Sequence, residues 1–552
     1  MIRARMMASR FRPLSSSLFL PLLPATRMGV GHILELVRMI LALADKQDVA
    51  ACARVCSAWT EDALDIVWRE LPSPLPLMRL VDESGLYPTM SWQTGQGQAI
   101  ISSKPIPWAR IRKFTMRVKR MGFDCTPWKT QIASFALFKA LSPDAPLLPN
   151  LEEVVVFPSS EMRWVQLVAM FLHPGVRRLE IRHPEGDGPS YFTYPDFFRE
   201  FSERCPHLEY LTIHGCSTLT LYRVWRPEDP INLARYAGMF PGLVHLSAPE
   251  AVVRHLENIP TTFPNLKRLI EVTSLYPKPY VQLPRHHWEP HIANTRIETL
   301  ALSLTLACAS TIITTNHPSH LRTLLLEAHM PRIDQQPLRQ FLQALGGSCP
   351  ALEDLTVRWT GILSHLMHDP QLANTEIDAT VFDPLAHCTL LSSLDITIPS
   401  SLTFNENGAA GLATILPNLQ ICRLTFIPIG GPAVEQRTLP ELGTLVPFAQ
   451  HCRRLQELSL VLDPRISIDD VDMTTIVAFN PEFRKLSIGQ FAPSVNWDPE
   501  SVAQYLSNLV PKYCSVKIPP RPHWSARWQH EDTIAAGTER LKQAFVLLSG
   551  FL

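Results

Sequence analysis

The sequence predicts an α/β fold, in which a small three-helix domain precedes a solenoid with parallel strands on its concave side and helices outside. Three observations predict it. A phrase with apolar residues at its first, fourth and usually sixth positions recurs thirteen times between Ile111 and Phe483. Prolines and helical patterns separate the copies. Residues 33–71, nearer the N-terminus, carry three short apolar stripes instead.

The phrase predicts a short strand, because its fourth and sixth residues lie two apart and point to one face. The clear copies are LEEVVV at Leu151, VRRLEI at Val176, LEYLTI at Leu208, LKRLIE at Leu266, IETLAL at Ile297, LRTLLL at Leu321, LEDLTV at Leu352, LQELSL at Leu455 and FRKLSI at Phe483. The weaker copies are IRKFTM at Ile111, LVHLSA at Leu243, LSSLDI at Leu391 and ICRLTF at Ile421. Their mean spacing is 31 residues (372 residues over twelve intervals), which is typical of stacked repeat units.

A proline stands just before the first apolar residue of many units, as Pro149-Asn150 does before Leu151. Proline stops the preceding helix and favours a turn into the strand. Upstream, Pro337–Leu345 carries apolar residues at helical spacing, with Pro337 suited to a helix start. Each unit therefore reads as helix, proline turn, strand and loop.

These units resemble the leucine-rich repeat family in its long and irregular form, over roughly residues 106–520. That family usually places Asn or Cys three residues after the last strand leucine, where the side chain caps the turn. Cys216 has this spacing, but Thr305 and Asp463 are among the residues that replace it elsewhere. The missing turn residues argue against an evenly curved horseshoe, although not against the strand–helix stack.

Residues 33–71 predict three short helices: one from Ile33 to Ala44, a second that begins at Asp48, and a third from about Trp59 to Leu71. Three helices in about forty residues bury little surface. Such a unit is often completed by a helix of a partner protein.

The same segment resembles the F-box, in the version found in large fungal families of F-box proteins. The matching features are Leu34–Val37, Ile40-Leu41, the Asp48-Val49 helix start, Arg54-Val55-Cys56 followed by Trp59, and Leu64 with Trp68-Arg69. One departure is Leu34, which stands where the family usually has proline. The resemblance implies docking on a Skp-type adaptor, and through it on the cullin and RING subunits of an SCF-type ubiquitin ligase.

The resemblance makes eight residues candidates for adaptor binding. They are Leu34, Leu36, Val37, Ile40, Leu43, Val49, Val55 and Trp59. The alternative is that several of them form the core of the segment itself, because an amphipathic stripe does not show what it faces.

A target protein would bind on the concave side of the solenoid, where residues that alternate with the buried ones of each strand are exposed. The candidates are Arg178, Glu180, Arg182, Tyr210, Thr212, His214, Asp354, Thr356 and Arg358. Their mixed chemistry indicates no single ligand class. The alternative is that most of them only solvate the sheet.

The composition and motifs of the sequence argue against several classes of function. The chain has 51 Lys and Arg and 51 Asp and Glu, so no global basic field favours nucleic acid. The sequence has no Walker loop, Gly-x-Ser-x-Gly or His-Glu-x-x-His motif, so we expect no enzymatic activity, cofactor or metal. The eleven cysteines form no Cys-x-x-Cys, and Cys205, Cys349, Cys388 and Cys452 occupy equivalent packing positions. This pattern favours a reducing compartment, the cytoplasm or the nucleus.

The predicted domains are an N-terminal extension (1–30), the F-box-like segment (31–72), a linker (73–105), the solenoid (106–520) and a C-terminal capping helix or tail (521–552). The extension is basic and resembles a targeting segment. The alternatives are a disordered tail or translation from Met28. No stretch is apolar enough to predict a membrane span. We expect a substrate-recognition subunit of an SCF-type ligase; the alternative is a ligase-independent interaction scaffold, which Leu34 motivates.

Overall fold

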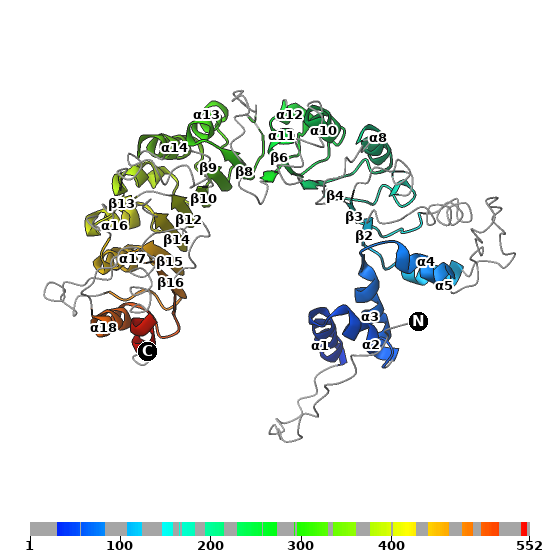
Figure 1. Ribbon diagram of the computed structural model, residues 1–552, viewed down its shortest axis with the longest axis horizontal. Helices are drawn as coiled ribbons and strands as arrows, with labels where there is room; N and C mark the ends of the chain where they lie inside the picture. The colour runs from blue at the N-terminus through cyan, green and yellow to red at the C-terminus, as the bar shows by residue number, and fades with distance from the viewer. Residues whose placement is uncertain are drawn as a thin grey trace, which may run out of the picture.

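The structure of the protein, a computed structural model, describes residues 30–55, 57–82, 108–123, 146–157, 165, 168–182, 194–214, 229–256, 258–272, 292, 295–328, 335–359, 376–398, 401–426, 440–462, 477–489, 498–517 and 542–548. These residues form an open arch (Figure 1). A curved parallel sheet lines the inner side, helices cover the outer side, and three helices stand at the N-terminal end.

The sheet has fifteen strands in the order β1-β2-β3-β4-β5-β6-β7-β8-β9-β10-β12-β14-β15-β16-β17, each parallel to its neighbour. The strands are β1 Glu70–Leu71, β2 Arg120–Phe123, β3 Glu153–Val156, β4 Arg178–Arg182, β5 Tyr210–His214, β6 His245–Pro249, β7 Arg268–Val272, β8 Thr299–Leu304, β9 Thr323–Ala328, β10 Asp354–Trp359, β12 Ser393–Ile398, β14 Ile421–Phe426, β15 Glu457–Val461, β16 Lys485–Gly489 and β17 Ser515–Lys517. A separate parallel pair joins β11 Glu376–Asp378 to β13 Ser401–Thr403. The predicted α/β class and parallel sheet are therefore confirmed.

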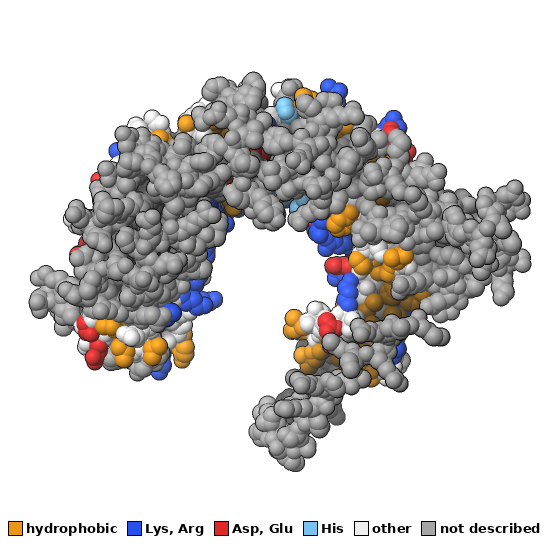
Figure 2. Space-filling view, in the orientation of Figure 1, with side chains coloured by type: hydrophobic (Ala, Val, Ile, Leu, Met, Phe, Trp, Pro, Cys, Tyr) orange, Lys and Arg blue, Asp and Glu red, His pale blue; other side chains and the backbone are white. Residues whose placement is uncertain are grey.

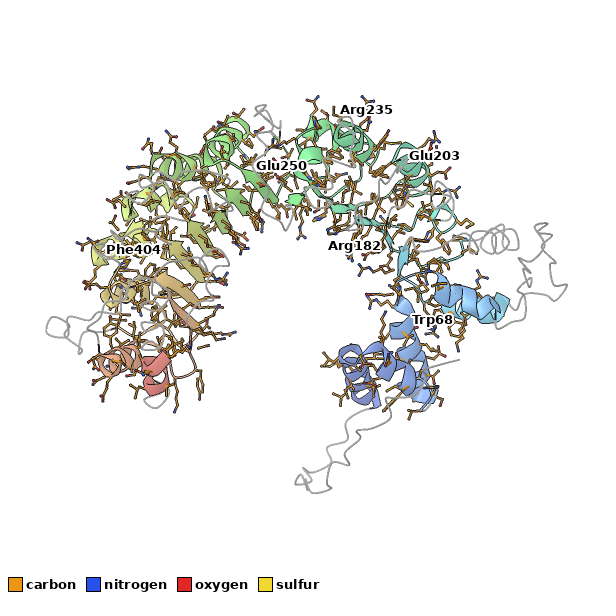
Figure 3. All side chains as sticks on the ribbon, in the orientation of Figure 1. Trp68, Arg182, Glu203, Arg235, Glu250 and Phe404 are labelled. Carbon is orange, nitrogen blue, oxygen red and sulfur yellow. The ribbon has the colours of Figure 1, made fainter. Side chains whose placement is uncertain are left out.

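Helices of the outer layer separate many of these strands. They are α8 Tyr194–Arg204, α10 Asp229–Ala237, α11 Glu250–Val253, α12 Ile259–Thr262, α13 Leu306–Asn316, α14 Gln335–Ser348, α16 Glu406–Ile415, α17 Leu445–His451 and α18 Pro499–Leu509, with 3₁₀ segments η3 Ala379–His387 and η5 Leu442–Thr444. Glu203 of α8 and Arg235 of α10 lie on the outside of the arch, whereas Arg182 of β4 lies on its inner side (Figure 3). The predicted helix within Pro337–Leu345 lies inside α14.

The apolar phrase packs as its spacing predicts. In the unit of β4, Val176, Leu179 and Ile181 are each at most 1% exposed and belong to one continuous core beneath the helices. The free energy gained by burying each such side chain is about 1.5–3 kcal/mol. Since every unit contributes to the same core, contacts between successive units stabilise the arch as well as contacts within each unit.

Two of the thirteen predicted copies are wrong in detail. The phrase at Ile111 lies in helix α5, Trp108–Thr115, because its apolar residues also fit a helical spacing. The strand comes later, in β2, where Met121 and Phe123 are the buried residues. The phrase at Ile421 is displaced by two: Ile421 aligns with Ser393, so Leu419, Cys422 and Leu424 form the buried set.

The sheet also begins before residue 106. Strand β1, which lies at the end of the predicted three-helix segment, pairs with β2. Helix α4, Leu75–Asp82, occupies part of the predicted linker. At the other end, residues 542–548 are helical, and Ala544 and Leu548 are buried in the main core. These two residues therefore belong to the same core as the strand units. Three predicted segments lie outside the described residues: 1–29, the rest of the linker (83–105) and the first part of the C-terminal segment (521–541).

The repeated cysteines are packing residues. Cys205, Cys388 and Cys452 are buried, and each thiol donates to a backbone carbonyl of the preceding unit, as Cys205 Sγ does to His173 O at 3.5 Å. Burial raises the pKa of Cys205 to about 12 and that of Cys388 to about 11. Within the described part of the chain, no three His, Cys, Asp or Glu residues form a metal-binding group. No helix of that part is long and apolar enough to cross a bilayer.

Candidate protein-interaction surfaces

The three N-terminal helices, α1 Val30–Leu43, α2 Lys46–Cys52 and α3 Ser57–Arg69, pack around a very small core. Its fully buried residues are Leu41, Val49 and Ala63. Asp45 caps α2 by accepting hydrogen bonds from the backbone of Gln47 and Asp48, which satisfies amide groups at the helix start. The other described apolar residues of these helices are half-buried or exposed.

Four exposed apolar residues form one face of α1, and a fifth follows α2. We call this set the apolar face: Leu36, Met39, Ile40 and Leu43, with Val55. Their exposed fractions are 55%, 59%, 57%, 88% and 70%. The α1 residues follow the spacing i, i+3, i+4, i+7, so they share one side of the helix. Figure 2 shows apolar side chains on this end of the molecule. The four α1 residues therefore form one exposed apolar stripe, and such a stripe is typical of a protein-binding surface.

The residues predicted to bind an adaptor differ in how exposed they are. Leu36, Ile40, Leu43 and Val55 lie on the apolar face. Val37 and Trp59 are half-buried, and Val37 packs on the small core. Val49 is fully buried and belongs to that core, so its predicted contact with a partner is corrected.

The side chain of Leu34 lies outside the described residues. Sequence reasoning missed Met39, although its position three residues after Leu36 was a sufficient signal.

Helix α3 fastens this three-helix unit to the arch. Trp68 packs on Phe114 of α5, with ring centroids 4.8 Å apart (Figure 3). Lys113 and Arg117 form ion pairs with Glu61, and α3 leads directly into β1. The apolar face is therefore part of a three-helix unit that α3 attaches to the first units of the sheet.

On the inner side of the arch, Glu180 is the centre of a cluster of charges. His214 Nε2 lies 2.7 Å, Arg182 Nε 2.6 Å and Arg120 Nη2 3.2 Å from its carboxylate. The hydrogen bond from His214 is the largest cause that lowers the pKa of Glu180 to about 2, and the bond from Arg182 adds to it. The structure thus brings together Glu180, Arg182 and His214, three of the predicted target-binding residues.

Two further predicted residues extend this cluster. The guanidinium group of Arg178 lies 4.4 Å from the ring centroid of Tyr210, a cation–π contact. Arg178 is exposed and Tyr210 half-buried, and Thr212 lies between Tyr210 and His214 on β5. A partner on this part of the concave face would meet arginine and aromatic surface, since the exposed fraction of the Glu180 side chain is 14% against 45% for Arg182.

The other predicted group, Asp354, Thr356 and Arg358 of β10, lies six strands from β4 in the order of the sheet. Arg358 contacts Asp395 of β12 at 3.5 Å. Arg423 of β14 lies 3.4 Å from the same carboxylate and forms a bidentate pair with Glu457 of β15 at 2.8 and 3.0 Å. The predicted list omitted Asp395 and Arg423, although the same alternation rule applied to the weaker phrases would have found them.

A second row of charges follows the edge of the sheet. It consists of the residue immediately before each strand, and we call it the edge row. In the first ten strands a cation of one unit pairs with a glutamate of the next: Lys119–Glu152 at 2.8 Å, Arg177–Glu209 at 2.7 Å, Lys267–Glu298 at 2.9 Å and Arg322–Glu353 at 3.2 Å. Each exposed pair contributes little to stability, at most about 1 kcal/mol.

Comparison with known proteins adds no family to these observations. No protein-family model matches the chain, and a search of curated proteins gives no significant match.

Proposed function

We propose that this chain is the substrate-recognition subunit of an SCF-type ubiquitin ligase. The three N-terminal helices would dock on a Skp-type adaptor, and the concave face of the arch would hold a target protein. The observation that carries the proposal is the apolar face on a three-helix unit whose own core, among the described side chains, has three fully buried residues. The F-box-like sequence of the same helices indicates a Skp-type adaptor as the partner.

The physical argument for docking rests on exposed area. Leu36, Ile40 and Leu43 lie on one side of α1 and are more than half exposed, so most of their apolar surface is in contact with water. A partner helix or groove would remove them from water, with a gain of about 25 cal/mol per Å² of apolar surface buried. Helix-in-groove recognition uses this spacing of anchors.

Such a subunit needs no catalytic residue. The cullin and RING subunits would bring a ubiquitin-charged enzyme close to the target, and holding two reactants in proximity accelerates their reaction. The three-helix unit and the C-terminal units lie at opposite ends of the arch, and the concave sheet spans the distance between them (Figure 1). The adaptor and the target would thus occupy different surfaces of one chain.

The test is co-expression of the full chain with the Skp-type adaptor of the same organism, followed by size-exclusion chromatography. We expect one complex of both proteins. The double variant Leu36→Glu/Ile40→Glu places two charges in the contact and should weaken the complex at least about 100-fold. Leu390→Glu is the matched control, since Leu390 is 53% exposed but lies in the arch. The proposal fails if the native chain, although folded, elutes without the adaptor.

A second function, a scaffold that does not recruit a ligase, is motivated by Leu34 in the position where the F-box family usually has proline. Under that function the native chain does not bind the adaptor. The variant Leu34→Pro then distinguishes the two cases. If it restores binding, the chain is an F-box protein that has lost this contact. If it does not, and circular dichroism shows that α1 is still formed, the helices serve another partner; the helix must be verified because proline at its fifth residue removes a helical hydrogen bond.

A further inference from the structure

The last three units of the arch carry Lys and Arg residues that pair with no glutamate of the edge row. In the edge row, Arg484 precedes β16, and its neighbour before β15 is Gln456 rather than a glutamate. Arg453 and Arg454 lie in the turn before β15, and Lys512 lies in the turn before β17. All four cations are exposed. They form no ion pair with any other residue that the structure describes.

Two more cations lie beside them on the concave face. Lys485 is the first residue of β16, and Lys517 of β17 lies opposite Ser487 of β16. Lys485 contacts Glu457 at 2.5 Å, and Lys517 is exposed. Neighbouring strands lie about 4.8 Å apart, so the three units bring these side chains within roughly 10 Å across the sheet. We call the set the basic end: Arg453, Arg454, Arg484, Lys485, Lys512 and Lys517.

The carboxylates within this region are few. Glu457 is mostly covered, with 14% of its side chain exposed, because Arg423 and Lys485 lie over it. Glu482 is the exposed acidic residue in the turn before β16. Among the residues of this region that the structure describes, six cations and these two carboxylates give a surplus of four positive charges. Figure 2 shows Lys and Arg side chains on the inner rim near the end of this arm.

Ion pairing between successive units does not account for these cations. Four cations of the earlier edge row each have a glutamate in the next unit, whereas Arg484 has none. Tyr513, beside Lys512, is 93% exposed, so an aromatic ring is also presented to solvent. Uncompensated cations close together repel one another, and an anionic ligand would relieve that repulsion. An exposed tyrosine among cations adds apolar contact area to such a site.

We infer that the basic end binds an acidic segment of a protein, an extended stretch rich in Asp and Glu side chains. The inference deepens the proposed recruitment of a target and rests on it. Because the whole chain has 51 basic and 51 acidic residues, it lacks the general positive field that attracts long polyanions such as nucleic acid. The basic end also lies across the opening of the arch from the three-helix unit, so a segment held there faces the proposed adaptor side (Figure 1).

The test uses fluorescence anisotropy on the full chain. The probe is a labelled peptide of alternating Glu and Ser, about eight residues long so that it spans the three turns. The comparison probes are the same peptide with Gln in place of Glu, and a single-stranded DNA of equal charge. We expect binding of the acidic peptide that weakens as salt rises, with weaker binding of both comparison probes.

The variants separate a site from general charge. Arg484→Gln should weaken peptide binding about 3- to 10-fold. Gln456→Glu should do the same without removing a cation, because it places beside Arg484 the glutamate that earlier units have. Arg322→Gln is the matched control, an exposed edge-row arginine that is paired with Glu353, and it should leave binding unchanged.

Three results would overturn the inference: no binding of the acidic peptide at low salt, equal weakening by Arg322→Gln and Arg484→Gln, or tighter binding of the DNA than of the peptide. Circular dichroism and the thermal midpoint verify that each variant is folded. Association with the adaptor is measured in parallel. If adaptor binding persists while the peptide fails to bind, the basic end is wrong and the proposed ligase role stands.

Discussion

The buried carboxyl of Glu271 should make the stability of this protein depend on pH near neutrality. Glu271 lies in β7 at the position where β4 and β5 have Ile181 and Ile213, and it is 7% exposed. Its Oε2 accepts a hydrogen bond from the backbone N–H of Ser303 at 2.9 Å, but its Oε1 has no hydrogen-bond partner among the described atoms. Burial raises the pKa of Glu271 from 4.5 to about 8, although Arg254 nearby opposes the shift.

The direction of this pH dependence follows from the difference in proton binding between the folded and unfolded states. Between pH 4.5 and 8 the folded state keeps a proton on Glu271 that the unfolded state releases, so stability falls as pH rises. Each unit of pH costs about 1.4 kcal/mol. From pH 5 to pH 7 the loss is therefore about 3 kcal/mol, and it approaches about 5 kcal/mol above pH 8. The loss is absent below pH 4.5, where both states are protonated.

The assay is urea unfolding followed by tryptophan fluorescence at several pH values, for the native chain and for Glu271→Gln. The difference between the two curves isolates this carboxyl, because all other titrating groups are common to both. Glu298→Gln in the next unit is the matched control: its pKa is lowered by the hydrogen bond from Lys267, so no change in slope is expected between pH 5 and 8. Parallel curves for the native chain and Glu271→Gln would refute the reasoning. Glu271→Leu should be more stable than the native chain at pH 8.

Three further predictions test packing and capping. Val49→Ala should cost about 2 kcal/mol in the small helical core, so that hydrogen exchange of α1–α3 becomes faster while that of β9 is unchanged. Thr305→Ala should cost about 1 kcal/mol in urea unfolding, because the Thr305 hydroxyl caps α13 by accepting from Cys308 N, and Thr305→Ser should restore the loss. Cys205 and Cys452, whose pKa values burial raises to about 12, should react with iodoacetamide at pH 8 only after unfolding; labelling of either in the folded protein, read by peptide mass spectrometry, would contradict their assigned packing.

The sheet was predictable because one periodicity is repeated many times. Two buried residues two apart, preceded by a third, define a strand even when the sixth position departs from the pattern, as Glu271 does. Ile111 was predicted wrongly, since a single copy at the start of the series cannot distinguish strand from helix spacing. The true strand uses Met121 and Phe123, which the leucine-based phrase did not include.

The candidate surfaces were predictable in part. Alternation along a strand identified Arg178, Glu180 and Arg182 as concave residues, but not that Arg120 from an earlier unit reaches Glu180. Helical spacing placed Leu36 and Ile40 on one face, but it could not separate them from Val49, which is buried. That distinction depends on how α2 packs on α3, and no local pattern contains it. That no described acidic residue pairs with Arg484 also emerges only when strands are aligned.

The alternating signs of the edge row limit how this arch can change length. Loss of the unit that contains Arg177 would bring Glu152 beside Glu209, and like charges on adjacent strands are destabilising. Removal of the two units that contain Glu152 and Arg177 would instead bring Lys119 beside Glu209 and keep opposite signs adjacent. Toward the C-terminus, Ser392, Gln420 and Gln456 carry no charge, so a single unit can be gained or lost there without this penalty. Insertions and deletions among related chains should therefore come in pairs of units between β2 and β5 and singly near the C-terminus.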